Sequence, residues 1–574
     1  EETYSNKSLR GTGKRSLYDS YIKAIRWASD RVKEKGIISY VTNGSFIDSN
    51  TMDGLRACLT DEFSRIYCFN LRGNIRKFDR AEGQNIFGSA SMTPVAITIL
   101  IKNPEHNGEC ELFYHDIGEF LNQKEKLQII SEFGSINRIQ WQRLLPNESH
   151  DWINQRNVEF ENFVSIGNKD NKLIEKSVFE IYSLGVVTNR DNWVYNSSKK
   201  QLINNINKTI NFYNKERERF FEEQKKDANL QLEGFIKYDL TQITWDIRKF
   251  QGGLKSNKDI KFDVNCLRVA NYRPFLKQNL YFNKDLIHSR YSQPKIFPIE
   301  SLQNLVICIS CLGGSKGLSA MMVNGIADLH FIGDTQCFGL YTYEKIDIEQ
   351  SPLFDTPAES SYRKKENITD AIWQEFQKNY NEKTISKEDI YYYVYGLLHS
   401  EEYKKQFASD LKKMLPRIPS VKTAADFWAF SKAGRKLAEL HLNYETVEPY
   451  PLKIETGSKM LTDTDYRVEK MRYGKNGKDK DLSTLIYNDK ITLSGIPLEA
   501  YDYIVNGKPA LDWVMERQSV TTHKDSGIVN DANLWATETV GDAAYPLKLF
   551  QRVITVSLET MKIVRALPVL DIAV

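Results

Sequence analysis

The sequence predicts an α/β protein with two parts: an open, twisted and mostly parallel sheet in residues 1–165, and a mixed α/β region with a helical middle in residues 166–574. Three observations lead to this prediction. Short apolar runs of strand type alternate with amphipathic helices in the first part. Helical patterns fill residues 366–445. A length of 574 residues exceeds what one ordinary core accommodates.

The first part alternates between helices and strands. Apolar spacing predicts helices at residues 17–32 and 51–61, and strands at residues 37–42, 65–71, 94–101 and 110–117. In an open α/β sheet, ligands bind beyond the carboxyl ends of the strands. The turn after the first strand holds Thr42, Asn43 and Gly44, which are therefore predicted to lie beside a ligand unless the segment is only another α/β unit.

The second part is expected to begin near residue 165, where the polar run SIGNKDNK interrupts the pattern. Its predicted elements are a long polar helix at residues 199–228, short strands in 261–345, helices in 366–445, a hairpin turning at 476–477, and helices at 509–518 and 545–566. The charges of the long helix run in mixed blocks, which is typical of a solvated face.

The charge balance excludes a globally basic nucleic-acid binder. Lys and Arg number 78 against 75 Asp and Glu, so any nucleic-acid site must be a local patch or cleft. The seven scattered cysteines argue against a disulfide framework and for a reducing cytoplasm. Cys308 and Cys311 have metal-like spacing but no second pair, so core cysteines are favoured and no metal site is assigned. No run of eighteen apolar residues occurs, so no membrane span is expected.

Three stretches between residues 189 and 295 combine basic and aromatic side chains, a chemistry that holds phosphates and reads base edges. Their candidate DNA-binding residues are Arg190, Lys199, Arg268, Arg273, Arg290 and Lys295. Any one of them alone is more readily explained as a solvated surface residue. The stretch CLGGSKGLSA adds Lys316 as a possible phosphate contact, although a tight structural turn explains the stretch as well.

An aromatic residue precedes the apolar run at residues 94–101. Phe87 could stack on a base swung out of a duplex, a surface that base-modifying enzymes need, or it could cap the core. Arg72, Arg76, Lys77 and Arg80 lie in the loop before it and would border the DNA-binding cleft from the catalytic side as further DNA contacts.

The sequence also resembles a known family. SLYDSYIKAIRWASDR, GIISYVTNGSFID and TPVAITILIKN resemble the later methyltransferase motifs of Type ISP restriction-modification enzymes. Further along, VVTNRDNWVYN, NYRPF, DIYYYVYGLLHS, FWAFSKAGRKLAELHLNYE and KDSGIVND resemble the specificity region of the same family. These enzymes are single polypeptides that combine nuclease, translocase, adenine methyltransferase and target recognition. The resemblance extends over essentially the whole chain.

The resemblance implies a function for each part. Residues 1–165 would be the trailing half of a Rossmann-like adenine-specific methyltransferase domain, and residues 166–574 a target-recognition domain for double-stranded DNA. S-adenosylmethionine would lie near Thr42, Asn43 and Gly44, and the flipped adenine would stack on Phe87. ATP and Mg²⁺ would belong to upstream translocase and nuclease segments of the same polypeptide, in a bacterial cytoplasm.

Two family motifs are missing from these residues. Neither the Gly-rich donor loop nor the Asn-Pro-Pro-Tyr tetrapeptide occurs, and no Walker-type loop is present. No catalytic residue is therefore assigned, and the chain is expected to be a fragment that recognises DNA without methylating it alone.

Two other functions stay open. A stand-alone specificity or scaffold protein would bind DNA without any catalysis, and an upstream reading frame carrying the missing motifs would exclude it. A nucleotide-handling enzyme built on the GGSKG loop would bind nucleotides as an isolated chain, which titration calorimetry tests.

Overall fold

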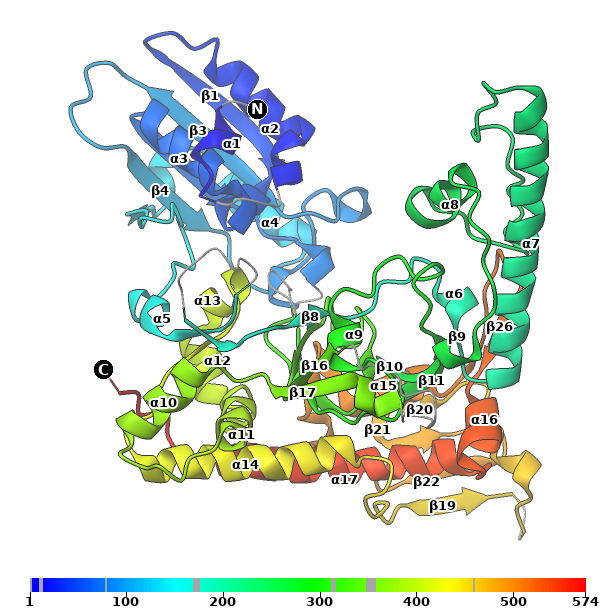
Figure 1. Cartoon of the computed structure of the whole chain (residues 1–574). Helices are drawn as coiled ribbons and strands as arrows, with labels where there is room; N and C mark the ends of the chain where they lie inside the picture. The colour runs from blue at the N-terminus through cyan, green and yellow to red at the C-terminus, as the bar shows by residue number, and fades with distance from the viewer. Residues whose placement is uncertain are drawn as a thin grey trace. The chain divides into compact units, whose positions relative to one another are not determined.

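The computed structural model describes residues 3–9, 14–77, 80–168, 176–310, 316–346, 358–457 and 460–573 (Figure 1). Two units can be distinguished. The first is built from Glu1–Asn162, Leu312–Lys316 and Phe407–Met414, and the second from Phe163–Cys311, Gly317–Gln406 and Leu415–Val574. The chain thus leaves the first unit close to the boundary expected near residue 165, and returns to it for two short segments.

The first unit contains one five-stranded sheet in the order β1-β3-β2-β4-β5. Its strands are β1 (Gly36–Asn43), β2 (Arg65–Asn70), β3 (Val95–Lys102), β4 (Glu111–Asp116) and β5 (Gln142–Leu144). The α/β prediction is confirmed, but the expectation of a mostly parallel sheet is wrong, because only β2 and β4 pair in parallel. A helical crossover makes β1 and β2 run in the same direction, and β3, which follows a loop without a long helix, returns between them in the opposite direction.

Helices cover both faces of this sheet. The helices of the first unit are α1 (Tyr4–Lys7), α2 (Ser20–Ser29), α3 (Asp53–Glu62), α4 (Gln123–Phe133), α5 (Val158–Asn162) and α13 (Ala408–Lys413). Ile38, Leu100 and Ile66 lie side by side across β1, β3 and β2 and pack in one core with side chains of α2 and α3. Since successive side chains of a strand point to opposite faces, Phe69 and Ile97 lie on the other face, where residues of α4 pack.

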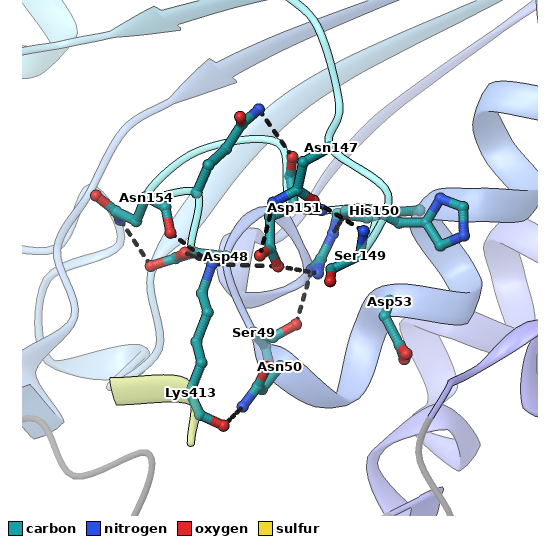
Figure 2. Close-up of polar contacts among 12 residues, drawn as sticks. Asp48, Ser49, Asn50, Asp53, Asn147, Ser149, His150, Asp151, Asn154 and Lys413 are labelled. Carbon is teal, nitrogen blue, oxygen red and sulfur yellow. Dashed lines mark hydrogen bonds and ion pairs between the residues drawn. The ribbon is translucent and has the colours of Figure 1, made fainter. Parts of the chain in front are cut away.

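A buried ionic network holds α13 within the first unit (Figure 2). The Lys413 ammonium lies 3.2 Å from a carboxylate oxygen of Asp151, and Arg56 lies 3.4 Å from the same oxygen. Lys413 also donates a hydrogen bond of 2.6 Å to the Asn154 carbonyl oxygen. The three charged side chains are almost completely buried, and burial lowers the pKa of Lys413 although Asp151 opposes this change. Each buried charge in this network is therefore stabilised by its ion-pair and hydrogen-bond partners, and removing one partner would leave another charge uncompensated.

The second unit contains three four-stranded sheets, β14-β10-β11-β9, β13-β12-β15-β8 and β19-β22-β21-β20, one three-stranded sheet, β18-β6-β7, and the two-stranded ladders β16-β17, β23-β24 and β25-β26. Their bounds are β6 (Val164–Gly167), β7 (Ser177–Phe179), β8 (Ser183–Leu184), β9 (Tyr195–Asn196), β10 (Leu267–Arg273), β11 (Leu276–Tyr281), β12 (Val306–Ile309), β13 (Ala320–Val323), β14 (Ile326–Ala327), β15 (Gln336–Gly339), β16 (Tyr341–Lys345), β17 (Tyr362–Glu366), β18 (Arg417–Ile418), β19 (Lys453–Thr456), β20 (Arg472–Asn476), β21 (Asp479–Ile486), β22 (Ile491–Ser494), β23 (Ile504–Val505), β24 (Lys508–Pro509), β25 (Val520–Thr522) and β26 (Val529–Asp531).

The helices of the second unit follow the expected pattern closely. They are α6 (Asp191–Val194), α7 (Lys199–Lys226), α8 (Gly252–Lys255), α9 (Gln293–Ile296), α10 (Asp370–Asn379), α11 (Lys387–Leu397), α12 (Glu401–Gln406), α14 (Ala424–Leu442), α15 (Ala510–Arg517), α16 (Ala532–Trp535) and α17 (Tyr545–Arg565). The predicted long helix, helical middle and two late helices are therefore confirmed. Ser198 caps α7, its side chain accepting a hydrogen bond from the Gln201 amide.

Two glycines allow α11 and α14 to pack at very short range. A Cβ atom added to Gly434 would lie 1.9 Å from the Tyr392 carbonyl oxygen, and one added to Gly396 would lie 2.3 Å from the Phe430 carbonyl oxygen. No other residue type fits at either position without displacing a helix backbone.

Candidate nucleic-acid interface

The residues predicted to lie near a cofactor and near a target base meet at one edge of the first sheet. Asn43, the last residue of β1, pairs with Val95, the first residue of β3. Val95 in turn donates a backbone hydrogen bond to Arg72, just beyond the end of β2. The loop that carries Phe87 connects β2 to β3 and so ends at this edge. The carboxyl ends of β1 and β2 are thus brought together, as a ligand site in an α/β sheet requires.

The turn after β1 is tightly built. The Asn43 side chain accepts a hydrogen bond of 2.9 Å from the Ser45 amide and caps the short helix that follows. A Cβ on Gly44 would lie 3.1 Å from the Ala96 Cβ, so glycine permits the close approach to β3. The buried Thr42 hydroxyl has no hydrogen-bond partner among the described residues. A polar group without a partner is thus left beside the turn.

Phe87 is held out of the core. Its side chain is 55% exposed, which disfavours the alternative that it caps the core. Buried Asn85 organises the loop, because its side-chain amide donates to the Gly73 and Thr93 carbonyl oxygens and its side-chain oxygen accepts from the Phe87 amide. The ring is therefore presented on an ordered loop, as a stacking surface would need to be.

The basic residues of this loop differ in their surroundings. The Arg72 guanidinium lies 2.6 Å from a carboxylate oxygen of Asp116 and 3.3 Å from one of Glu119, so its charge is balanced within the unit. Arg76 is exposed. The side chain of Lys77 lies outside the described residues.

Two of the arginines predicted to bind DNA are paired inside the second unit, where Arg190 is buried and Arg273 is half-buried. Arg190 forms an ion pair with Asp246, and its guanidinium lies 4.2 Å from the centre of the Phe250 ring. Burial lowers the pKa of Arg190 to about 9. Arg273 lies 2.6 Å from Asp328, whose pKa is raised by burial to about 6. Both arginines therefore stabilise the fold through partners inside the chain, and their contact with DNA stays a prediction.

The other predicted residues are more accessible. Arg268 and Arg290 are half-buried, and burial lowers the pKa of both. Lys199 at the start of α7, Lys295 in α9 and Lys316 are exposed.

A basic patch forms around one of these residues. We define it as Arg248, Lys249, Lys258, His288 and Arg290. The pKa of Lys249 is lowered by burial and then by the charges of Arg248, Arg290 and Lys258. The pKa of His288 is likewise lowered by burial and then by Arg248, Arg190 and Lys249. The contacts agree with the proximity of these charges, because Lys249 donates to the Lys284 carbonyl oxygen, Arg290 donates to the Phe282 carbonyl oxygen, and Lys258 pairs with Asp285.

A π-helical turn, Ile247–Gln251, carries two members of the basic patch. Asp246 caps this turn, its side chain accepting a hydrogen bond of 2.5 Å from the Lys249 amide. The Lys249 ammonium donates a hydrogen bond of 2.9 Å to the Lys284 carbonyl oxygen, which ties the turn to the loop before His288. π-Helical turns occur frequently at functional sites. Of the five members of the patch, only Arg290 was predicted from the sequence, although the run IRKFQGGLK carries the same mixture of basic and aromatic residues as the stretches that were selected.

In the described ranges, no three His, Cys, Asp or Glu side chains are grouped so that they could hold a metal ion. The helices of those ranges include none with the length and apolar content needed to cross a bilayer.

The chain is similar to proteins of one family. The family model of the Type ISP C-terminal specificity domain matches residues 177–549. No curated protein matches the chain. A nuclease-deletion mutant of the Type ISP restriction-modification enzyme LlaGI, in complex with a DNA substrate mimic, is 36% identical with a TM-score of 0.84 over 100% of this chain and 42% of its own.

Two further structures share the fold. The ATP-dependent Type ISP restriction-modification enzyme LlaBIII bound to DNA is 35% identical with a TM-score of 0.84, over 100% of this chain and 35% of its own. The DrdV–DNA complex is 29% identical with a TM-score of 0.79, over 99% of this chain and 54% of its own. The chain thus spans about a third to a half of these relatives. Because the specificity-domain model covers more than half of its residues, the chain belongs to the family of Type ISP restriction-modification enzymes.

Proposed function

We propose that the second unit recognises a specific sequence in duplex DNA, as the specificity part of a longer restriction-modification enzyme. The observation that carries the proposal is the basic patch, which lies within residues 177–549, the part that matches the family's specificity domain. The net charge of the chain is only +3, so a local cluster of this kind is what phosphate binding requires.

The basic patch would position the duplex rather than read its sequence. Lysine and arginine side chains bind phosphate oxygens and fix the register of a protein on DNA, whereas base edges supply sequence information. Within the patch, Lys258 pairs with Asp285, which also lies near Lys249, and the charges of Arg248 and Arg290 repel that of Lys249. A phosphate placed among them would relieve this repulsion. Lys199, Arg268 and Lys295 of the same unit would add contacts along the same duplex. Lys316 belongs to the first unit and would be a separate phosphate contact.

The first unit would serve the methyltransferase reaction of the longer enzyme. The Thr42 hydroxyl lacks a partner within the described part of the chain, and Gly44 keeps a Cβ out of the turn; both features fit a wall of a cofactor pocket. Thr42, Asn43 and Gly44 would line S-adenosylmethionine, which supplies the methyl group when bound. Phe87 would stack on the target adenine, with Arg76 beside the DNA backbone. ATP-driven translocation and cleavage would depend on other segments of the longer enzyme.

Charge reversal of the basic patch tests the DNA-binding proposal. Replacing Arg248 and Lys249 together with glutamate should weaken binding to duplex DNA. It should also flatten the dependence of log affinity on log salt concentration by about 0.9 for each lost phosphate contact, or about 1.8 for both. Fluorescence anisotropy on a labelled duplex at several salt concentrations measures both effects.

The matched control carries the same charge change elsewhere in the second unit. Lys436 on α14 and Lys562 on α17 line another groove, and their replacement by glutamate should leave the salt dependence unchanged. If both double variants lose affinity equally, binding responds only to net charge and the basic patch is not the interface.

A further inference from the structure

A polar cleft of about 280 Å³ lies within the second unit, apart from the residues of the basic patch. Its walls come from three segments: α6 with β9, the strands β10 and β11, and the end of α15 with the β25–β26 hairpin. The hairpin is fixed to β9 by two hydrogen bonds of 3.0 Å each. The Ser197 amide donates to the Asn530 side-chain oxygen, and the Asn196 side chain donates to the Val529 carbonyl oxygen. The cleft is therefore built by the fold and is not a gap beside a loose loop.

Two buried polar atoms in the walls lack partners. Among the described residues, neither the Tyr195 hydroxyl nor the side-chain oxygen of Gln278 makes a hydrogen bond, and both side chains are 2% exposed. The Gln278 amide nitrogen has only one long contact, 3.4 Å from the Ser197 hydroxyl. An unsatisfied buried polar group costs roughly 1–3 kcal/mol, so two of them in one cleft indicate that something else completes their hydrogen bonding.

We infer that this cleft receives the hydrogen-bonding edge of a nucleobase of the recognised DNA, with Gln278 and Tyr195 as determinants of sequence specificity. The inference rests on the function proposed above. It assigns base reading to a place separate from the phosphate contacts of the basic patch.

The chemistry of the cleft favours a base over a phosphate. Asp191 and Glu516 line it and are paired with Arg273 and Arg517, so the charges balance and an uncharged hydrogen-bonding group suits the cleft better than an anion. A glutamine amide can form two hydrogen bonds with adenine, through N6 and N7, and so distinguishes it from other bases. The rings of Tyr195 and Tyr272 lie 4.6 Å apart and provide an aromatic wall against which a base can lie. The volume is near the lower end for ligand pockets, which suits one base.

Selection from a library of randomised duplexes tests the inference with the full 574-residue chain. The wild type, Gln278→Leu and Tyr195→Phe are each used to select and sequence bound duplexes. The expected result is that both variants lose preference at a single base pair, with discrimination there falling at least about fivefold, whereas affinity for non-specific duplex stays within about twofold. The base could be read within the duplex or after it is extruded from the duplex. 2-Aminopurine at that position distinguishes the two cases, because its fluorescence rises on binding only if the base is extruded.

A folding control accompanies the selection. Tyr195→Phe should leave the melting temperature unchanged or raise it, because the lost hydroxyl has no hydrogen-bond partner in the ranges that the structure describes. Tyr393→Phe should lower the melting temperature and leave the selected sequence unchanged, since the buried Tyr393 hydroxyl donates a hydrogen bond of 2.7 Å to the Pro419 carbonyl oxygen.

Two results would overturn the inference in different ways. If both cleft variants fold and select the wild-type sequence with wild-type discrimination, the cleft does not read a base, although the DNA-binding function stands. If the wild type itself selects no preferred sequence, the proposed recognition function fails and the inference fails with it.

Discussion

Replacing His441 with glutamine should change how steeply the chain loses stability between pH 7 and pH 5. His441 lies near the end of α14 with its side chain 1% exposed. Its Nδ1 lies 2.5 Å from the Tyr395 hydroxyl, and its Nε2 lies 3.0 Å from the Thr560 hydroxyl and 3.1 Å from the Tyr503 hydroxyl. Burial among these neutral groups lowers the pKa of His441 to about 3.

The size of the effect follows from the difference between the folded and unfolded states. At pH 7 the imidazole is mostly neutral in both states and contributes little to the pH dependence of stability. Below its ordinary pKa of 6.5 the unfolded chain gains a proton that the folded chain does not accept until near pH 3. The free energy of unfolding therefore falls by about 1.4 kcal/mol per pH unit, or about 2 kcal/mol by pH 5. His399 acts in the same direction, because burial lowers its pKa well below 6.5.

Urea unfolding followed by tryptophan fluorescence gives the free energy of unfolding at pH 7 and at pH 5. The difference between the two values is determined separately for each variant. In His441→Gln the loss of stability between the two pH values should be about 2 kcal/mol smaller than in the wild type. Tyr503→Phe is the control, because it removes a hydrogen bond of the same cluster without removing the titrating group, so its pH dependence should equal that of the wild type. An equal pH dependence in His441→Gln and the wild type would refute the reasoning.

Three other substitutions have defined outcomes. Lys413→Met should lower the free energy of unfolding by about 3 kcal/mol in urea titrations, because Asp151 loses one of its buried cations; unchanged stability would contradict the role of the network. Gly434→Ala should destabilise the chain by at least about 1–3 kcal/mol. Gly457→Ala is the control and should melt like the wild type, because its Cβ would meet nothing within 4 Å. Equal melting temperatures for the two variants would contradict the close helix contact. In a longer enzyme that contains the donor loop, Phe87→Ala should slow adenine methylation more than it weakens DNA binding, and a wild-type methylation rate would exclude the stacking role.

Much of the secondary structure could be predicted from the sequence because its signals are local. The apolar run expected as a strand at residues 94–101 forms β3 at Val95–Lys102, and the polar helix expected at residues 199–228 forms α7 at Lys199–Lys226. The direction of β3 could not be predicted, because a buried strand has the same apolar pattern whichever way it runs.

The site was less predictable because it depends on partners that are distant in the sequence. Arg273 lies in a basic and aromatic stretch typical of a DNA contact. The fold instead pairs it with Asp328, which is 55 residues away in the sequence. Arg248 and Lys249 lie in a run with the same basic and aromatic composition as the predicted stretches, but their proximity to Arg290 is set by the fold. Phe87 differs in that one of its contacts is local: buried Asn85, two residues away, accepts a hydrogen bond from the Phe87 amide, and the ring is exposed.

The return of Phe407–Met414 to the first unit has a consequence for how the protein is made. At a translation rate of about 5–20 residues per second, some 250 residues emerge between Asn162 and Lys413 in roughly 12–50 s. During that interval Asp151 lacks its ion pair with Lys413, so the nascent first unit stays incompletely folded while the rest of the chain is synthesised. Ribosome-bound chains that stop before residue 413 should therefore be cleaved readily by protease near Asp151, and chains a few dozen residues longer should resist.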